Sequence, residues 1–364
     1  MYSLAQNGYT WAQVLELMKQ SRTVTYGFDI LDKNDTAIGE VHSPDCKIFN
    51  NIDATIQRSA SLTIIEDKEI DFASERLRPY MKLKTPNGIL TYPLGVFLMS
   101  SPARQASGGA IRRSVECYDK MQILNDDRFD SRYTVPAGTS YTAAVANIVQ
   151  SAGIMQCDIS PSELETVTAM EFPIGTSKLS ACNDLLAAIN YYPLYADSFG
   201  FVRAKEYELP DGRSIDAFYA TDKASIIQPG AQEELDIFGA PNKVVRYLEN
   251  AERQYMIASV TNDDPNSKLS TVSRGRVITD IAAVSDIANQ SSLDAYVARV
   301  MAESKVYQKI VFETLNMPNH EYNDCLYVDD SELDIAGKYT EIAWEMDLWT
   351  GGKMKHQCRK AVGL

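Results

Sequence analysis

Residues 54–65 read ATIQRSASLTII. The polar residues of this stretch occupy every second position, and the positions between them carry mainly apolar residues. The polar set is Thr55, Gln57, Ser59, Ser61 and Thr63, and the other set is Ala54, Ile56, Arg58, Ala60, Leu62 and Ile64. A period of two is typical of a strand that turns one face to the core and the other to solvent. We therefore predict a half-buried strand over residues 54–65.

The same period continues on both sides of this stretch. It places four apolar residues on one face of an earlier strand: Val24, Tyr26, Phe28 and Ile30. Further strands are predicted near residues 79–84, 89–99 and 111–118, with turn-forming PNG and SGG triplets between them. Ahead of all of them, Thr10 is expected to cap a helix with the apolar stripe Trp11, Val14, Leu15 and Met18. We interpret residues 1–132 as a mainly antiparallel β module, with the strand spacing of a barrel or sandwich.

A helical period replaces the strand period in the middle of the chain. One predicted helix carries Tyr141, Val145, Ile148, Val149 and Ala152 and stops at Gly153. A second helix begins near Ser177, and a hairpin around Asp197 and Ser198 follows it. Residues 133–210 are therefore predicted to form a small α/β insert.

Strand patterns return in the last part of the chain. They cover residues 243–249, 254–261, 306–315 and 339–349. One helix interrupts them, and Ser291 with Asp294 is expected to form its capping box. Residues 211–364 are predicted to form a second β-barrel-like module with one helix. The expected fold class is thus α+β and mainly β, with two antiparallel β-barrel-like modules flanking the α/β insert.

Composition excludes several classes of protein. The chain has 364 residues and a net charge of −14, and this charge opposes nonspecific binding to nucleic acid or to an anionic membrane. Its apolar runs are far shorter than the ~20 residues of a membrane span. No secretory signal is visible at the N-terminus, so folding in a reducing cytosol is expected. The six cysteines contain no C-x-x-C pair, and we interpret them as buried thiols.

The sequence contains no recognisable catalytic signature. Phosphate-binding loops, dinucleotide-binding glycine motifs and nucleophile elbows are all missing. The stretch from His320 to Asp324 starts like a zinc-protease helix but has Asp where the second His belongs. The three histidines, His42, His320 and His356, are expected to be surface or loop-packing residues. We predict no catalytic residue, no cofactor-binding residue and no metal ligand, and therefore no cofactor.

Two groups of residues leave alternatives open. Paired carboxylates at Asp126-Asp127, Asp263-Asp264 and Asp329-Asp330 are expected to be solvated or to cap turns, although a glycosidase pair would use the same residue type. The tyrosines at 191, 192 and 195 suit either a contact surface or the rims of strands.

Several stretches together resemble the tail hub proteins of long-tailed bacteriophages. The matching patterns of turns and apolar positions are residues 127–139, Ala152-Gly153-Ile154, 175–200, Pro241–Val245, 291–305, Pro318–Asp324 and Trp344–Leu348 with Gly351-Gly352. This family is related in fold to the hubs of contractile tails and phage-like bacteriocins and to type VI secretion spikes. The resemblance implies a virion structural protein at the tail tip or baseplate, assembled in the cytoplasm of the bacterial host.

The resemblance also implies a set of partners. Three copies would form a ring that ends the tail tube, so the expected partners are the chain itself, a tail tube or distal tail protein, a central spike or tip protein, and a tape-measure protein. DNA or other cargo would pass the acidic lumen without specific binding. The chain ends soon after its last strands, so a fused hydrolase domain is not expected. Interface residues stay unassigned. The alternatives are a tail-associated cell-wall hydrolase and a carbohydrate-binding module.

Overall fold

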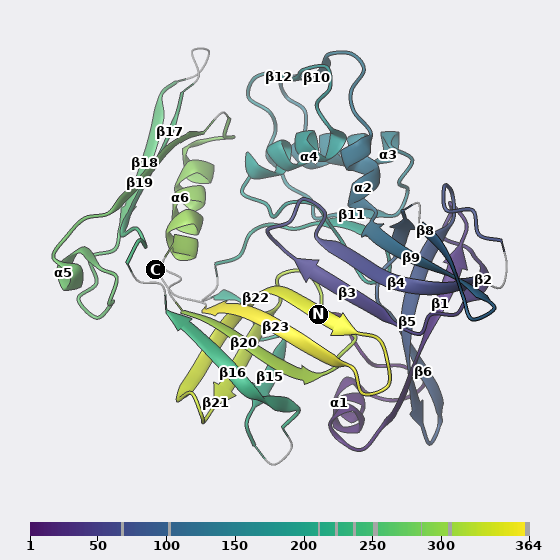
Figure 1. Cartoon of the computed structure of the whole chain (residues 1–364). Coiled ribbons are helices and arrows are strands. Elements are labelled where there is room, and N and C mark those ends of the chain that lie inside the picture. Colours follow the sequence, from purple (N-terminus) through teal and green to yellow (C-terminus); the bar gives the residue numbers. More distant parts are fainter. Residues whose placement is uncertain are drawn as a thin grey trace.

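The computed structural model describes residues 1–66, 69–100, 103–209, 212–222, 225–235, 238–249, 254–284, 286–304 and 308–360. In this part of the chain strands outnumber helices, and most strand pairs are antiparallel, so the predicted α+β, mainly β class is confirmed. Figure 1 shows a β-rich body, the insert with its helices above it, and a small sheet with one helix beside both. No helix of the described residues combines the length and the apolar character needed to cross a bilayer.

The first region supplies the helix α1 (Trp11–Lys19) and nine strands of the body. These strands are β1 (Thr23–Leu31), β2 (Ala37–Val41), β3 (Cys46–Asn51), β4 (Arg58–Glu66), β5 (Arg76–Thr85), β6 (Gly88–Pro93), β7 (Phe97–Met99), β8 (Ala103–Ser107) and β9 (Ala110–Asp119). Helix α1 begins as predicted, because the Thr10 side chain accepts from the Gln13 backbone and the Gln13 side chain returns a bond to Thr10. Val14 and Met18 face the core.

Strand β4 confirms the predicted alternation but starts later than expected. Arg58, Ala60, Leu62 and Ile64 are buried, whereas the intervening residues are half-buried. Residues 51–57 instead form a turn, in which the backbone N–H of Asn51 donates to the backbone carbonyl of Gln57 at 2.9 Å. The prediction of a strand over Ala54–Gln57 is therefore wrong, because these residues form a tight turn although their sequence alternates.

The two outer parts of the chain meet in one sheet. Its strand order is β16-β20-β23-β22-β3-β4-β9-β7-β5-β1-β2, with further strands attached at the sides. Strand β22 (Ile335–Asp347) pairs antiparallel with β3, for example Trp344 opposite Asn50. The other strands from the last part are β15 (Ala217–Ala220), β16 (Ile227–Leu235), β20 (Gln308–Leu315), β21 (Cys325–Asp330) and β23 (Lys353–Lys360). The division of the chain at residues 132 and 210 stays a prediction.

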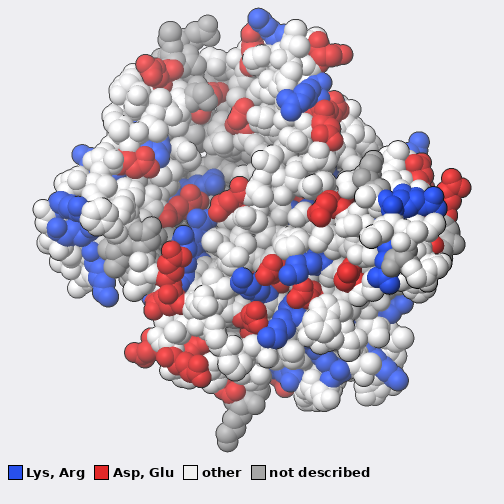
Figure 2. Space-filling view, viewed as in Figure 1, with Lys and Arg blue, Asp and Glu red and all other residues white. Residues whose placement is uncertain are grey.

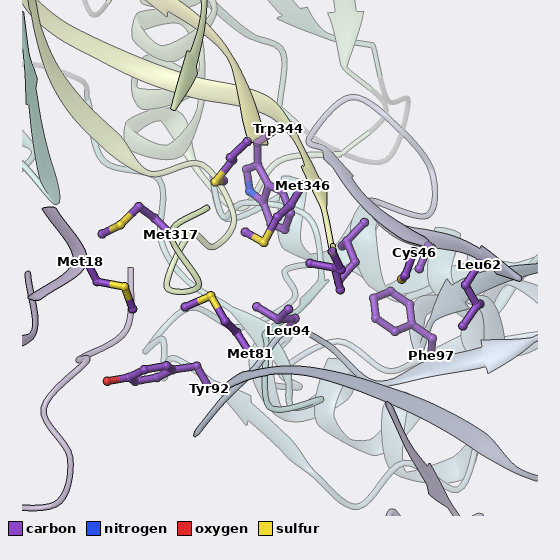
Figure 3. Packing of buried hydrophobic residues seen from close by; sticks show 14 of the residues in the cluster. Met18, Cys46, Leu62, Met81, Tyr92, Leu94, Phe97, Met317, Trp344 and Met346 are labelled. Carbon is purple, nitrogen blue, oxygen red and sulfur yellow. The ribbon is translucent and has the colours of Figure 1, made fainter. Parts of the chain in front are cut away.

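One hydrophobic core serves both halves of this sheet. Figure 3 shows Met18 of α1 and Met81 of β5 in the same buried cluster as Met317 and as Trp344 and Met346 of β22. Methionine suits the boundary between two packed regions because its flexible thioether fills irregular gaps. The two β regions are therefore held together by shared apolar packing as well as by the β22–β3 strand pair.

The insert has its own core. Helix α2 (Met121–Asp126) leads into it, and α3 (Tyr141–Ser151) packs on α4 (Lys178–Ala187), which Ser177 caps. The predicted hairpin forms, with Tyr195 opposite Arg203. Its strands are β10 (Tyr133–Val135), β11 (Cys157–Ile159), β12 (Met170–Phe172), β13 (Tyr195–Ala196) and β14 (Val202–Ala204).

A third core lies under a small sheet. Strands β17 (Lys243–Leu248), β18 (Met256–Thr261) and β19 (Thr279–Val284) are covered on one face by α6 (Gln290–Ser304). The predicted capping box is wrong in register, because Asn289, not Ser291, accepts the Ser292 backbone N–H, and Ser291 lies inside the helix. A short additional helix, α5 (Thr271–Arg274), precedes β19.

All six cysteines are free. Five of them are buried, as predicted, but Cys157 is only half-buried. Burial raises the pKa of the Cys117 and Cys182 thiols well above their ordinary value, so these thiols stay neutral and unreactive near neutral pH.

Candidate functional site: a buried polar junction and an exposed sheet face

Arg58 connects three separate parts of the chain inside the molecule. It lies on the inward face of β4 with 1% of its side chain exposed, and it donates to Glu321 Oε2 and to Ser198 Oγ, each at 2.8 Å. The guanidinium also lies 5.3 Å from the ring centre of Trp344 on β22. Strand β4, the insert hairpin and the loop before β21 therefore converge on one buried cation.

Glu321 completes this connection. Its Oε1 accepts the Ser198 backbone N–H at 3.0 Å, so both carboxylate oxygens are used. Burial raises the pKa of the Glu321 carboxyl, although the Arg58 charge acts in the opposite direction. Removing either member of such a pair leaves the other charge buried without compensation, which is strongly destabilising.

A second buried network lies on the core side of β22 and β23. Glu341 accepts from the Nδ1 atoms of His320 and His356, each at 2.6 Å. Burial by itself would raise the pKa of Glu341, but the positive charge of His320 and the hydrogen bonds from both histidines lower it to about 2. Burial also lowers the pKa of His356. The carboxylate is therefore held ionised between two rings.

The same trio could in principle hold a metal ion, since its ligand atoms lie within 4.8 Å of one another. The partners of the rings argue for hydrogen bonding instead. His320 Nε2 lies 2.7 Å from the Tyr219 hydroxyl, and His356 Nε2 lies 2.8 Å from the Thr314 hydroxyl. All four ring nitrogens thus have a protein partner. A catalytic metal also needs an open ligand position, and these side chains are closed off from solvent.

We call Arg58, Glu321, Glu341, His320 and His356 together the Arg58 junction, which was not predicted from the sequence. The prediction of a surface or loop-packing role holds for the exposed His42 and for His320, which packs in the loop before β21. It is wrong for His356, which lies on β23. His320 and His356 are fully buried and come together on Glu341. A signal was present in the alternation of β4, which places Arg58 among apolar residues. A charged residue at an inward position indicates a buried partner.

One carboxylate of each predicted pair has an ionic or hydrogen-bonding partner close in the fold. Asp127 forms an ion pair with Lys178 at 2.5 Å, and Asp264 and Asp330 accept backbone N–H groups in their own turns. Tyr191, Tyr192 and Tyr195 are all buried within the chain, and Tyr195 begins the strand β13. Tyr192 and Tyr195 are buried and pack against Tyr322, with ring centres 5.8 and 4.6 Å apart.

The β17–β19 sheet offers the opposite kind of surface. Its inner face packs on α6, and Figure 1 shows its other face turned away from the insert and the body. Ile257 and Ile281 lie on this outer face and are 51% and 62% exposed. Tyr247, opposite Ile257, and Val245, opposite Ile281, complete an uncharged apolar patch at its centre. We call these four residues the outer patch.

Solved structures with a similar fold include tail proteins and a type VI secretion component. A tail protein from Neisseria meningitidis has a TM-score of 0.67 at 12% identity, covering 92% of this chain and 97% of that one. A 43 kDa prophage tail protein from Shewanella oneidensis has a TM-score of 0.61 at 11% identity, covering 92% and 98%. A type VI secretion component from E. coli has a TM-score of 0.51 at 10% identity, covering 88% and 74%.

These likenesses confirm, at the level of fold, the resemblance drawn from the sequence. The chain has the fold of phage tail proteins over nearly its whole length. No protein-family model and no curated protein sequence matches it.

Proposed function

We propose that this protein is a structural hub of a phage tail or phage-like particle, in which three copies form a ring that ends the tail tube and docks a central spike or tip. One observation carries the proposal: the fold is shared with tail proteins over 92% of this chain and over 97% and 98% of theirs.

The outer patch supports an assembly role. A soluble monomer gains nothing by exposing a contiguous apolar surface, and such surfaces commonly mark contacts with other chains. Each copy carries a net charge of −14, so two copies repel each other least where they meet through an uncharged face. In the proposed ring this patch contacts the neighbouring copy.

The remaining partners follow from the position at the end of a tube. We propose a tail tube or distal tail protein on one side and a spike or tip protein on the other, with a tape-measure protein in the lumen. The excess of carboxylates would let DNA or cargo pass without binding. The protein would be a virion component at the tail tip or baseplate, assembled in the host cytoplasm.

We propose further that the protein is not an enzyme. The histidines that could act as acid or base are closed off in the Glu341 network, apart from the exposed His42. The paired carboxylates that could form a hydrolase site bind a lysine or backbone groups instead.

The mass in solution tests the ring. Light scattering behind a sizing column should give three times the chain mass of 40.5 kDa, about 122 kDa. A stable dimer would contradict the threefold arrangement. Loss of turbidity from a peptidoglycan suspension, removed by substituting one carboxylate, would contradict the structural role and favour a cell-wall hydrolase.

A further inference from the structure

A basic pocket opens where the insert, α6 and the ends of β22 and β23 meet. Its volume is about 220 Å³. Figure 2 shows charges of both signs in the hollow beside the small sheet lobe. The charged residues that line the pocket are Arg213, Arg299, Arg359 and Lys360 together with Asp53 and Glu303. Four basic residues against two acidic ones make the pocket positive in a chain whose net charge is −14.

Two of the arginines, Arg213 and Arg359, have no acidic partner among the described residues. Arg213 is 8% exposed and donates to neutral oxygens, the Thr340 hydroxyl at 3.4 Å and the Asn323 carbonyl. Arg359 lies opposite Thr340 in the β22–β23 pair and lines the same pocket. Within the described residues neither guanidinium has a carboxylate at ion-pair distance. A nearly buried guanidinium without a counter-charge is costly, and an incoming anion would remove that cost.

Tyrosine rings line the pocket, and Arg299 is held against one of them by its own hydrogen bonds. Arg299 is fixed by Glu303 at 3.2 Å and by the Tyr191 carbonyl at 3.2 Å. Its guanidinium lies 4.6 Å from the ring centre of Tyr207. Burial lowers the pKa of the adjacent Lys205 amine, and the positive charge of Arg213 lowers it further, as expected next to an unneutralised cation.

We propose that this pocket binds the carboxylate of an acidic side chain on a partner protein. Planar guanidinium groups match a carboxylate through paired hydrogen bonds, and the tyrosine rings can pack on the methylene groups of a glutamate. The pocket is small and has an excess of two positive charges, so it does not offer the extended basic track that a nucleic-acid backbone requires, and the negative charge of the whole chain also repels phosphates. The inference goes beyond the proposed ring, because it holds for a monomer as well.

Calorimetric titration tests the site with three probes: glutarate, a hexaglutamate peptide and inorganic phosphate. We expect one glutarate or peptide per chain, and at least tenfold weaker binding to the Arg359→Gln variant. Lys353→Gln is the matched control, because Lys353 is on the same strand, is half-exposed and pairs with Glu313. It should bind like the wild type. Circular dichroism of both variants confirms that they are folded.

Three results would overturn the proposal. They are no binding of glutarate or peptide, equal weakening in the Lys353→Gln control, and binding of phosphate as tight as that of glutarate. The last result would make the pocket a general phosphate site. Because the titration is independent of oligomeric state, its failure leaves the ring proposal untouched, and a monomeric mass leaves the pocket untouched.

Discussion

The Arg58 junction and the outer patch reverse the usual placement of residue types. The junction buries Arg58, Glu321, Glu341 and two histidines, and gives each a hydrogen-bonding or ionic partner from another part of the chain. The outer patch leaves Ile257 and Ile281 more than half exposed. Buried polar groups with specific partners fix how the regions of one chain meet, whereas exposed apolar groups are available to another chain.

Breaking the Arg58–Glu321 pair should have the largest effect on stability. We expect Arg58→Ala to lower the free energy of unfolding by about 4 kcal/mol, because it leaves Glu321 buried without a counter-charge. Denaturant unfolding measures the change. The matched control is Arg78→Ala, whose partner Asp29 is 2.6 Å away but whose side chain is 33% exposed. A loss below about 1 kcal/mol is expected there, and equal losses in the two variants would contradict the special role of the junction.

The Glu341 network should have the next largest effect, with a characteristic pH dependence. Because its folded pKa is about 2 and its ordinary value is 4.5, ionised Glu341 stabilises the folded state fully above pH 4.5 and loses that contribution as the pH falls toward 2. Glu341→Gln should therefore cost on the order of 3 kcal/mol at pH 7. The cost should shrink below pH 4.5.

Unfolding of wild type and variant across this pH range provides the measurement. Glu345→Gln is the control, since Glu345 lies on the same strand and its nearest lysine nitrogens are 3.8 Å away. It should show little cost at any pH. A cost for Glu341→Gln that stays constant down to pH 2 would mean that the carboxylate is not held ionised by the two histidines.

A local contact at the surface should have a smaller effect on stability than either buried network. Thr10→Ala removes the cap of α1 and should cost about 1 kcal/mol, because an N–H group of the first turn loses its acceptor. Thr10→Ser keeps the hydroxyl and should recover most of the loss. If Thr10→Ala cost as much as Arg58→Ala, burial would not be what distinguishes the junction.

The local elements were predictable because their signals are short in sequence. The cap at Thr10, the helix stop at Gly153 and the alternation in β4 each depend on neighbours a few residues away. The pairing of β22 with β3 joins residues nearly 300 positions apart, for example Trp344 and Asn50, and no periodicity encodes such a partner. The junction was missed for the same reason, since His320, Glu341 and His356 meet only once the strands have paired.

The outer patch should have the smallest effect on stability and the largest on assembly. An exposed isoleucine contributes little to the fold of its own chain, so Ile257→Asp should change the free energy of unfolding by less than about 0.5 kcal/mol. A charge there would be buried in the proposed contact and should prevent it. Ile38→Asp, at a 54% exposed position on β2, is the control for a surface charge outside the patch.

The most direct test is the light-scattering mass of wild type and of Ile257→Asp, measured beside their unfolding free energies. We expect a mass of about 122 kDa, three times 40.5 kDa, for the wild type and 40.5 kDa for the variant, which should remain folded. A trimer that survives Ile257→Asp, or a wild-type protein that is already a monomer, would contradict the claim that this face joins neighbouring copies.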